Sequence, residues 1–406
     1  MTAASSPVVP WTCPFCALLC DEVAWSSAPP ALRGSDCPRA AAALRAHAGA
    51  AAATATVDGR AVAFDDALAE AARRLARWRL PLFGGLGTDV AGARALYRLA
   101  ERRGAICDHA DGAALMHGLR ALQDRGQYTT TLAELRARAD LVVCIGTAAT
   151  PRHPEFFRRC GLREATARAR RLVFLGAEAD TSLPGELAVE HLPGTGDAFD
   201  DLRQLAALVG RRRVREPHPA LSGLADRLLA ARYAVLVWEP GRLPAAGALW
   251  AEALNRIVAT LNQHTRAASL ALGGDDGAAT VNQVFTWLSG LPLRSRCAPG
   301  GLVHEPLLFD AARLVADGAV DGLLWISSFD AARLPPGTLP RIVLGPPAMA
   351  AKLAARDCVF LPVATPGLNA PGHLFRTDGV VLVPLAAVRD DGLRGVAEVL
   401  RALEAA

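Results

Sequence analysis

Short apolar runs alternate with helical periods along most of the chain. Residues 64–78 have an acidic start and apolar positions three or four residues apart, which predict an amphipathic helix. The apolar run at residues 79–83 predicts a strand, residues 84–87 (Gly-Gly-Leu-Gly) predict a tight turn after it, and residues 89–103 predict the next helix. Strand, helix and strand in this order indicate a parallel sheet covered by helices on both faces.

The same alternation continues to the C-terminal region, and we expect an α/β fold. Further strands are predicted at residues 105–107, 139–145, 171–175, 233–238, 267–272, 322–326, 341–344 and 358–363. The pair Asp378-Gly379 predicts a turn into a terminal strand at residues 380–383.

The chain of 406 residues exceeds the ~250–300 residues at which single cores usually stop growing, so we expect several domains. Residues 1–60 are rich in Cys, Pro and Ala and predict a small N-terminal domain. The Arg-rich stretch at residues 211–219 is the best candidate linker. We therefore expect a Cys-rich domain at 1–60, an α/β domain at 61–215 and a second α/β domain at 216–406.

Composition excludes several classes of protein. Apolar residues make up 51% of the chain and charged residues 21%, which is typical of a globular protein. The 44 basic and 40 acidic residues form no sustained basic tract, so nucleic acid is not an expected partner. No apolar stretch reaches the ~18 residues of a membrane span, and residues 1–10 lack the features of a secretory signal. We expect a cytoplasmic protein without a membrane segment.

Four of the nine cysteines fall within the first 37 residues. Cys13, Cys16, Cys20 and Cys37 are separated by two, three and sixteen residues. Such thiolates can surround a [4Fe–4S] cluster, because one loop supplies three ligands and a distant cysteine the fourth. A four-cysteine zinc site more often uses two C-x-x-C pairs, and this segment contains one. Reduced thiols without a metal are the third interpretation.

A second polar group lies at the end of a predicted strand and the start of a helix. It contains Asp108, His109, Asp111 and His117. The carboxyl ends of strands are where α/β sheets bind ligands, so these residues could form a catalytic group, although a histidine at a helix start often serves only as a cap. The glycines at residues 84–87 do not form the G-x-G-x-x-G pattern of a dinucleotide-binding turn.

These residues resemble the B subunit of formylmethanofuran dehydrogenase, a branch of the molybdopterin oxidoreductases. The likeness begins at Cys13-Pro14-Phe15-Cys16 and continues in order through Val57-Asp58-Gly59, His117-Gly118, Arg138-Ala139-Asp140, His153-Pro154, Asn282-Gln283 and Phe375-Arg376. The resemblance implies Rossmann-like domains, a [4Fe–4S] cluster on the N-terminal cysteines and a tungsten or molybdenum bis-pterin that reduces CO₂ to formate.

The chain departs from that family at the metal and pterin sites. Met116 stands before His117-Gly118, where the family has the cysteine or selenocysteine that binds the metal. A thioether is neutral and a weak acceptor, so it does not replace a thiolate. The family's Gly-x-Asn-Pro reads Gly146-Thr147-Ala148-Ala149 here, its Asp-Pro-Arg reads Leu175-Gly176-Ala177, and its Glu-Gly-Thr reads Pro371-Gly372-His373. We expect no tungsten or molybdenum pterin, no catalytic residue, and a degenerate site at Met116 and His117.

This combination is similar to the B subunits of the formyltransferase/hydrolase complex of methylotrophic bacteria. The resemblance implies a non-catalytic scaffold beside an amidohydrolase-like A subunit, a C subunit and a formyltransferase D subunit. That complex passes the formyl group from tetrahydromethanopterin to a methanofuran-like carrier and hydrolyses it to formate, as a part of formaldehyde oxidation. The resemblance also supports a cluster on Cys13, Cys16, Cys20 and Cys37. The alternative is an active tungsten or molybdenum pterin oxidoreductase that interconverts CO₂ and formate.

Overall fold

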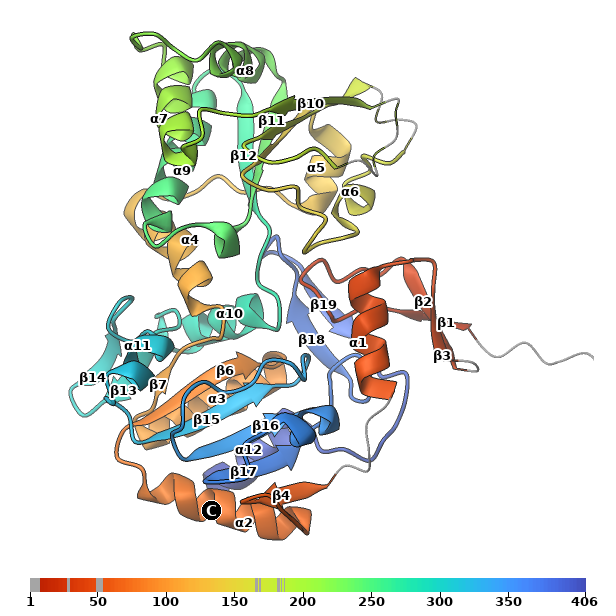
Figure 1. The fold of residues 1–406 in the computed structure, drawn as a ribbon, viewed down its shortest axis with the longest axis vertical. Helices are drawn as coiled ribbons and strands as arrows, with labels where there is room; N and C mark the ends of the chain where they lie inside the picture. Colours follow the sequence, from red (N-terminus) through yellow and green to blue (C-terminus); the bar gives the residue numbers. More distant parts are fainter. Residues whose placement is uncertain are drawn as a thin grey trace, which may run out of the picture. The chain divides into compact units, whose positions relative to one another are not determined.

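The computed structural model describes residues 8–27, 30–48, 54–164, 167, 169–180, 183, 185 and 187–406. The expectation about the start of the chain therefore lies largely outside the described residues. The chain divides into two compact units. Unit 1 comprises Met1–Gly112 and Gly274–Ala406, and unit 2 is Ala113–Gly273, inserted between them. Both units are α/β, as predicted (Figure 1).

Unit 1 is built on a nine-stranded mixed sheet in the order β14-β13-β7-β6-β15-β16-β17-β4-β5. The strands from β7 to β17 are parallel, and the two edges are antiparallel hairpins. The strands are β4 (Ala55–Val57), β5 (Arg60–Val62), β6 (Pro81–Gly87), β7 (Ile106–Cys107), β13 (Ser295–Ala298), β14 (Gly301–His304), β15 (Gly322–Ser327), β16 (Arg341–Gly345) and β17 (Cys358–Pro362). The helices are α2 (Phe64–Arg77), α3 (Val90–Arg103), α10 (Ala278–Ser289), α11 (Ala311–Ala316), the 3-10 helix η3 (Pro347–Lys352) and α12 (Val396–Ala405).

Two smaller sheets complete unit 1. An antiparallel sheet of β1 (Val8–Trp11), β2 (Val23–Ser27) and β3 (Pro30–Arg33) precedes α1 (Pro38–Ala48). The hairpin of β18 (Gly372–Phe375) and β19 (Leu382–Leu385) contains the predicted Asp378-Gly379 turn. Leu19, in the loop between β1 and β2, packs against Leu374, Val383 and Leu385 of this hairpin, which is drawn in blue in Figure 1. The loop between β1 and β2 carries three of the four N-terminal cysteines, so these small sheets position the candidate metal ligands.

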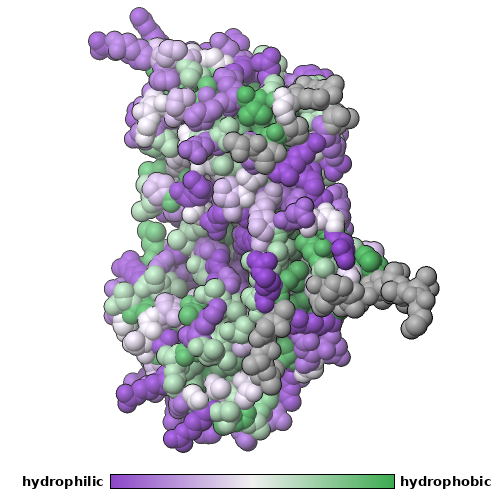
Figure 2. Space-filling view, turned by 45° about the vertical axis from the view of Figure 1, so that its right-hand side comes forward, coloured by the Kyte–Doolittle hydropathy of each residue, from purple (hydrophilic) through white to green (hydrophobic). Residues whose placement is uncertain are grey.

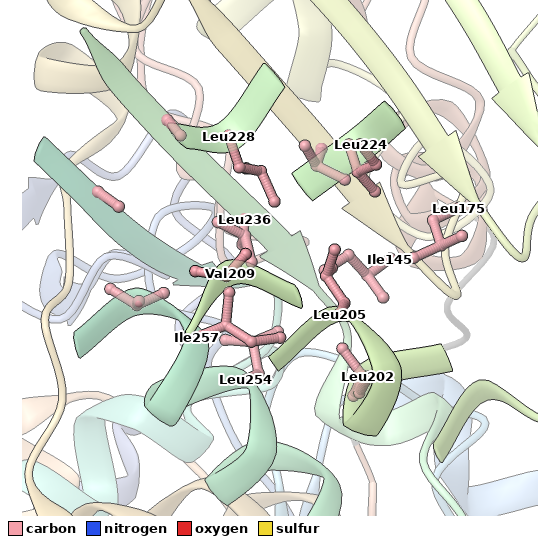
Figure 3. Packing of buried hydrophobic residues seen from close by; sticks show 14 of the residues in the cluster. Ile145, Leu175, Leu202, Leu205, Val209, Leu224, Leu228, Leu236, Leu254 and Ile257 are labelled. Atoms are coloured by element: carbon pink, nitrogen blue, oxygen red, sulfur yellow. The ribbon is translucent and has the colours of Figure 1, made fainter. Parts of the chain in front are cut away.

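Unit 2 contains a five-stranded parallel sheet in the order β10-β9-β8-β11-β12. Its strands are β8 (Leu141–Ile145), β9 (Arg171–Leu175), β10 (Ala188–Leu192), β11 (Tyr233–Trp238) and β12 (Arg266–Ala271). Its helices are α4 (Gly112–Arg125), α5 (Leu132–Arg138), α6 (Phe156–Arg159), α7 (Ala198–Val209), α8 (Pro219–Ala230), the 3-10 helix η2 (Pro240–Arg242) and α9 (Gly247–Leu261). Side chains of α7, α8 and α9 pack on β8, β9 and β11 in one apolar core (Figure 3).

The predicted division into residues 1–60, 61–215 and 216–406 differs from these units. The hairpin β4–β5 turns at Asp58 and Gly59, both with positive φ, and β4 then pairs with β17 in the nine-stranded sheet. The end of the predicted N-terminal domain is thus part of the main sheet of unit 1. The Arg-rich stretch at 211–219 connects α7 to α8, whose leucines share one core, so it is a surface loop inside unit 2.

The predicted turn at residues 84–87 is also wrong, because these residues form the end of β6. Every residue of this strand is buried. A Cβ on Gly85 would lie 2.6 Å from the carbonyl oxygen of Ile326 and 2.9 Å from the indole of Trp325. The glycines therefore let β6 pass close to β15, and the register of this pair shifts between Trp325 and Ser327.

Candidate functional site

The cysteine loop is closed by its own backbone. Cys13 N–H donates to the carbonyl of Cys20 at 2.9 Å, and Leu19 N–H donates to the carbonyl of Cys16 at 3.1 Å. Cys37 lies just before α1, and its carbonyl accepts a hydrogen bond from Ala41 at 3.0 Å. All four cysteines are buried, with 6–8% of each side chain exposed, and none forms a disulfide.

Burial makes the thiols of Cys13 and Cys16 hard to ionise, and negative charge on neighbouring thiols opposes their ionisation further. Burial raises the pKa of Cys13 to about 12, and the neighbouring Cys20 and Cys37 add to the increase. The pKa of Cys16 is raised well above its usual range. Burial is the largest cause, and the negative charges of Asp275, Cys13 and Cys20 raise it further. Cys13 and Cys16 are therefore protonated at neutral pH unless a bound metal stabilises their thiolates.

Both metals considered from the sequence take cysteine thiolates as ligands. Among the described residues, no three His, Cys, Asp or Glu side chains form a group that could hold a metal ion. Zinc requires its four ligands around a single centre, whereas each thiolate of a [4Fe–4S] site binds a different iron atom. The four buried cysteines supply the donor type that either metal requires.

Met116 and His117 lie on α4, within unit 2. Met116 is buried, with 3% of its surface exposed. The His117 ring lies against the start of α9, because a Cβ on Gly247 would come within 2.8 Å of it. Gly118 faces Trp238 at the end of β11, because a Cβ on Gly118 would lie 3.7 Å from the indole of Trp238. The position that holds the metal ligand in the resembled family is thus a buried thioether.

The loops that correspond to the pterin-holding loops are bound by the chain itself. After β8, the Thr147 hydroxyl donates to the carboxylate of Glu239 and accepts a hydrogen bond from Ala149 N–H at 2.8 Å. Glu239 is 2% exposed and pairs with Arg152 at 4.0 Å. Gly176 N–H donates to the carbonyl of Leu192 at 2.9 Å. These groups are engaged internally, and a buried carboxylate repels a pyrophosphate, so the loops do not fit a pterin dinucleotide.

The polar residues at 108–117 are divided between the units, with Asp108, His109 and Asp111 in unit 1 and His117 in unit 2. His109 Nδ1 accepts a hydrogen bond from Asp111 N–H at 2.9 Å, and Nε2 donates to the carbonyl of Asp276 at 3.1 Å. Burial lowers the pKa of His109 to about 4, so the ring is neutral. Asp108 pairs with Arg294 at 3.2 Å and accepts from Ala311 N–H at 2.8 Å. Both side chains are satisfied within the fold, as expected for structural residues.

Sequence inspection did not identify Asp275 and Asp276, which precede α10. Asp275 is 3% exposed and accepts hydrogen bonds from Ala17 N–H and Arg39. Burial raises the pKa of Asp276 to about 8, although Arg333 lies 3.4 Å from its carboxylate. The only signal in the sequence is an acidic pair between glycines after a strand, Gly274-Asp275-Asp276-Gly277, which is usually a solvent-exposed turn.

Comparison with known proteins identifies relatives over most of the chain. No protein-family model matches it. It is 32% identical over 285 residues to the B subunit of the formyltransferase/hydrolase complex Fhc of Methylorubrum extorquens, covering 68% of this chain and 75% of that protein. It is 26% identical over 347 residues to the B subunit of the tungsten-containing formylmethanofuran dehydrogenase 2 of Methanocaldococcus jannaschii, covering 80% of this chain and 78% of that protein.

The solved structures agree with the sequence comparison. A chain in the crystal structure of the formyltransferase/hydrolase complex FhcABCD from Methylorubrum extorquens, in complex with methylofuran, superposes with a TM-score of 0.74. The match covers 86% of this chain and 98% of that chain, at 28% identity. The resemblance inferred from the cysteine motif is thereby confirmed. At this identity and coverage, the chain belongs to the family of B subunits of the formyltransferase/hydrolase complex.

Proposed function

We propose that this chain is a non-catalytic B-type subunit of a formyltransferase/hydrolase complex. The complex would convert formyl-tetrahydromethanopterin to formate through a methanofuran-like carrier, in one-carbon oxidation. Its similarity to the Fhc B subunit and to a chain of the FhcABCD structure supports this function. Its expected partners are the amidohydrolase-like A subunit, the C subunit and the formyltransferase D subunit.

The buried Met116 carries the proposal that the chain itself is not a CO₂ reductase. A thiolate is a strong, anionic ligand for high-valent tungsten and molybdenum, whereas the sulfur of Met116 is neutral, methylated and a weak donor. The loop after β8 is a second obstacle to pterin binding, because the Thr147 hydroxyl is hydrogen-bonded to the buried carboxylate of Glu239. The reacting groups for formyl transfer and hydrolysis would therefore belong to the partner subunits.

The four buried cysteines support a retained [4Fe–4S] cluster in a molybdopterin-oxidoreductase-like N-terminal region. When bound, such a cluster supplies a one-electron redox centre and crosslinks the polypeptide. Because position 116 holds a methionine, we expect no tungsten or molybdenum centre that could exchange electrons with the cluster, so we assign the cluster a structural role. Cys13, Cys16, Cys20 and Cys37 would hold it.

Two further features bear on where and how the chain works. All nine cysteines are free of disulfides, which is typical of a reducing compartment and supports a cytoplasmic location. In the described residues, no helix is long and apolar enough to cross a bilayer. Figure 2 shows hydrophobic side chains at the surface among hydrophilic ones. Large apolar residues such as Trp287 and Val380, 57% and 65% exposed, offer contact area for partner subunits.

A reconstituted complex tests the proposed function. The chain is co-expressed with A, C and D subunits, and formate release from formyl-tetrahydromethanopterin is measured with and without it. We expect that leaving the chain out prevents assembly and abolishes activity, whereas Met116→Leu leaves the rate within about twofold, because these side chains have similar volumes. CO₂ reduction with an artificial electron donor should be absent. A loss of CO₂ or formate turnover in Met116→Leu would instead support an active oxidoreductase.

A further inference from the structure

Ala17, the residue that follows Cys16, is held through both its N–H and its carbonyl within unit 1. The Oδ1 atom of Asp275 accepts a hydrogen bond from Ala17 N–H at 2.7 Å. On the other side, Thr377 N–H donates to the carbonyl of Ala17 at 2.8 Å. Asp275 belongs to the loop before α10, and Thr377 to the hairpin β18–β19. The middle of the cysteine loop is therefore attached to two segments that lie far away in the sequence.

Asp275 also attaches the fourth cysteine indirectly. Its Oδ2 atom accepts a hydrogen bond from Arg39 Nη1 at 2.8 Å, and the two side chains form an ion pair. Arg39 stands in the first turn of α1, two residues after Cys37. One carboxylate thus connects the loop of Cys13, Cys16 and Cys20 to the helix that begins beside Cys37. Because Asp275 is only 3% exposed, water competes little for these bonds.

Apolar packing fixes the next residues of the loop. Leu18 and Leu19 are 0% and 1% exposed, and Leu19 packs with Phe329, Leu374, Val383 and Leu385. Leu19 has a φ of +43°, in the left-handed region that a leucine adopts only when its surroundings enforce it. All these contacts are made by protein atoms. These protein contacts support the shape of the loop.

Asp275 acts on the loop through hydrogen bonds, and its bonds to Ala17 and Arg39 involve no cysteine sulfur. Its favourable interactions are with the backbone of Ala17 and with the guanidinium of Arg39, which set the geometry of the loop.

We propose that Asp275 is a positioning residue that holds residues 13–20 and the start of α1 in a fixed arrangement before any metal is bound. The cysteine loop is then ordered in the metal-free protein, and metal binding does not have to order it. The inference extends the proposed cysteine site, but its central claim concerns the metal-free chain.

Hydrogen exchange and thiol alkylation on the metal-free, reduced complex test this claim. In the wild type we expect slow exchange over residues 11–27 and slow alkylation of Cys13, Cys16 and Cys20. In Asp275→Ala, both rates should rise by roughly tenfold to a hundredfold, because a buried charge-assisted bond is lost. Asp275→Asn keeps one acceptor for Ala17 N–H and should show an intermediate rate, which also provides a test if the alanine variant folds poorly.

Asp201→Asn is the matched control. Asp201 is also 3% exposed and accepts a backbone hydrogen bond, from Thr195 N–H at 2.9 Å, but it lies in unit 2. Its substitution should leave the exchange and alkylation rates of the cysteine loop unchanged. Equal protection of the loop in wild type and Asp275→Ala, or rapid alkylation in the metal-free wild type, would overturn the proposal.

Iron analysis separates this inference from the proposed cluster. One outcome is that the anaerobically prepared wild type contains no iron, while its cysteine loop is protected from exchange and loses this protection in Asp275→Ala. The cluster assignment then fails and the positioning role stands. If iron is bound but the metal-free loop is already unprotected, the reverse holds. Where a cluster is present, Asp275→Asn should raise its reduction potential, because a negative charge next to the cluster is removed.

Discussion

The cysteine loop of unit 1 and the α4 region of unit 2 both resemble segments that bind metal in formylmethanofuran dehydrogenase, but they differ in what they retain. The loop keeps four buried thiols and is held by contacts from α1, the loop before α10 and the hairpin β18–β19. On α4, Met116 stands where the resembled family has its metal ligand. In the loop after β8, Thr147 is hydrogen-bonded to Glu239, which follows β11. The cysteines thus lie in a segment that contacts from elsewhere in the chain support, whereas position 116 holds a buried thioether.

The largest effect is expected at the cysteines. Cys16→Ser should abolish bound iron and the visible absorption of the anaerobically purified complex, because a hydroxyl is a poor ligand for iron–sulfur clusters. Cys144→Ser is the control, because Cys144 is also fully buried but lies on β8, outside the loop. Equal iron content in Cys16→Ser and wild type would remove this side of the comparison.

A second prediction concerns pH and Asp276, the neighbour of the positioning residue. The folded pKa of Asp276, about 8, is raised above its unfolded value near 4, so the folded state holds the proton more tightly. This contribution to stability is complete below pH 4 and is lost as pH rises to 8, by on the order of 3–5 kcal/mol. Asp276→Asn should flatten this dependence, measured as the free energy of unfolding from denaturant titrations between pH 5 and 8. An unchanged slope would contradict the raised pKa.

The third prediction tests the apolar support of the cysteine loop. Leu19→Ala should lower the free energy of unfolding by about 2–4 kcal/mol, because it leaves a cavity among Phe329, Leu374 and Val383. Leu249→Ala serves as a control, since Leu249 is 57% exposed, and it should change stability by less than about 0.5 kcal/mol. Similar effects of the two substitutions would show that the loop is not packed as described.

The smallest effect is expected at α4. Met116→Cys places a thiol at the position of the family's metal ligand, yet it should not recruit tungsten or molybdenum, because the loops after β8 and β9 lack a pterin site. Elemental analysis after expression in a host that makes the cofactor checks this. Metal binding by Met116→Cys would mean that the pterin loops are still functional and that position 116 alone was lost.

Much of the fold could be predicted from the sequence. The strands at residues 171–175 and 233–238 have the predicted bounds, because continuous apolar runs mark strands buried on both faces. The edge strand β10 (Ala188–Leu192) was missed, since most of its residues are exposed and give no such signal. The glycines of β6 were interpreted as a turn, because the residue that requires them, Trp325 on the neighbouring strand β15, lies more than 200 residues away in the sequence.

The candidate site could be predicted only in part. Cysteine spacing identified the four thiols, and the substitution at Met116 was visible in the sequence. Asp275 could not be found in this way, because its partner Ala17 is 258 positions away and an acidic pair between glycines usually marks an exposed turn. The boundary predicted at residue 215 does not coincide with a limit of either compact unit, since a polar loop between packed helices has the same composition as a linker.

Metal analysis of the intact complex, purified without oxygen from a host that makes both cofactors, tests the comparison most directly. We predict about four iron atoms per copy of this chain and neither tungsten nor molybdenum. About one tungsten or molybdenum atom per chain, with turnover of CO₂ or formate that Met116→Leu abolishes, would contradict the account.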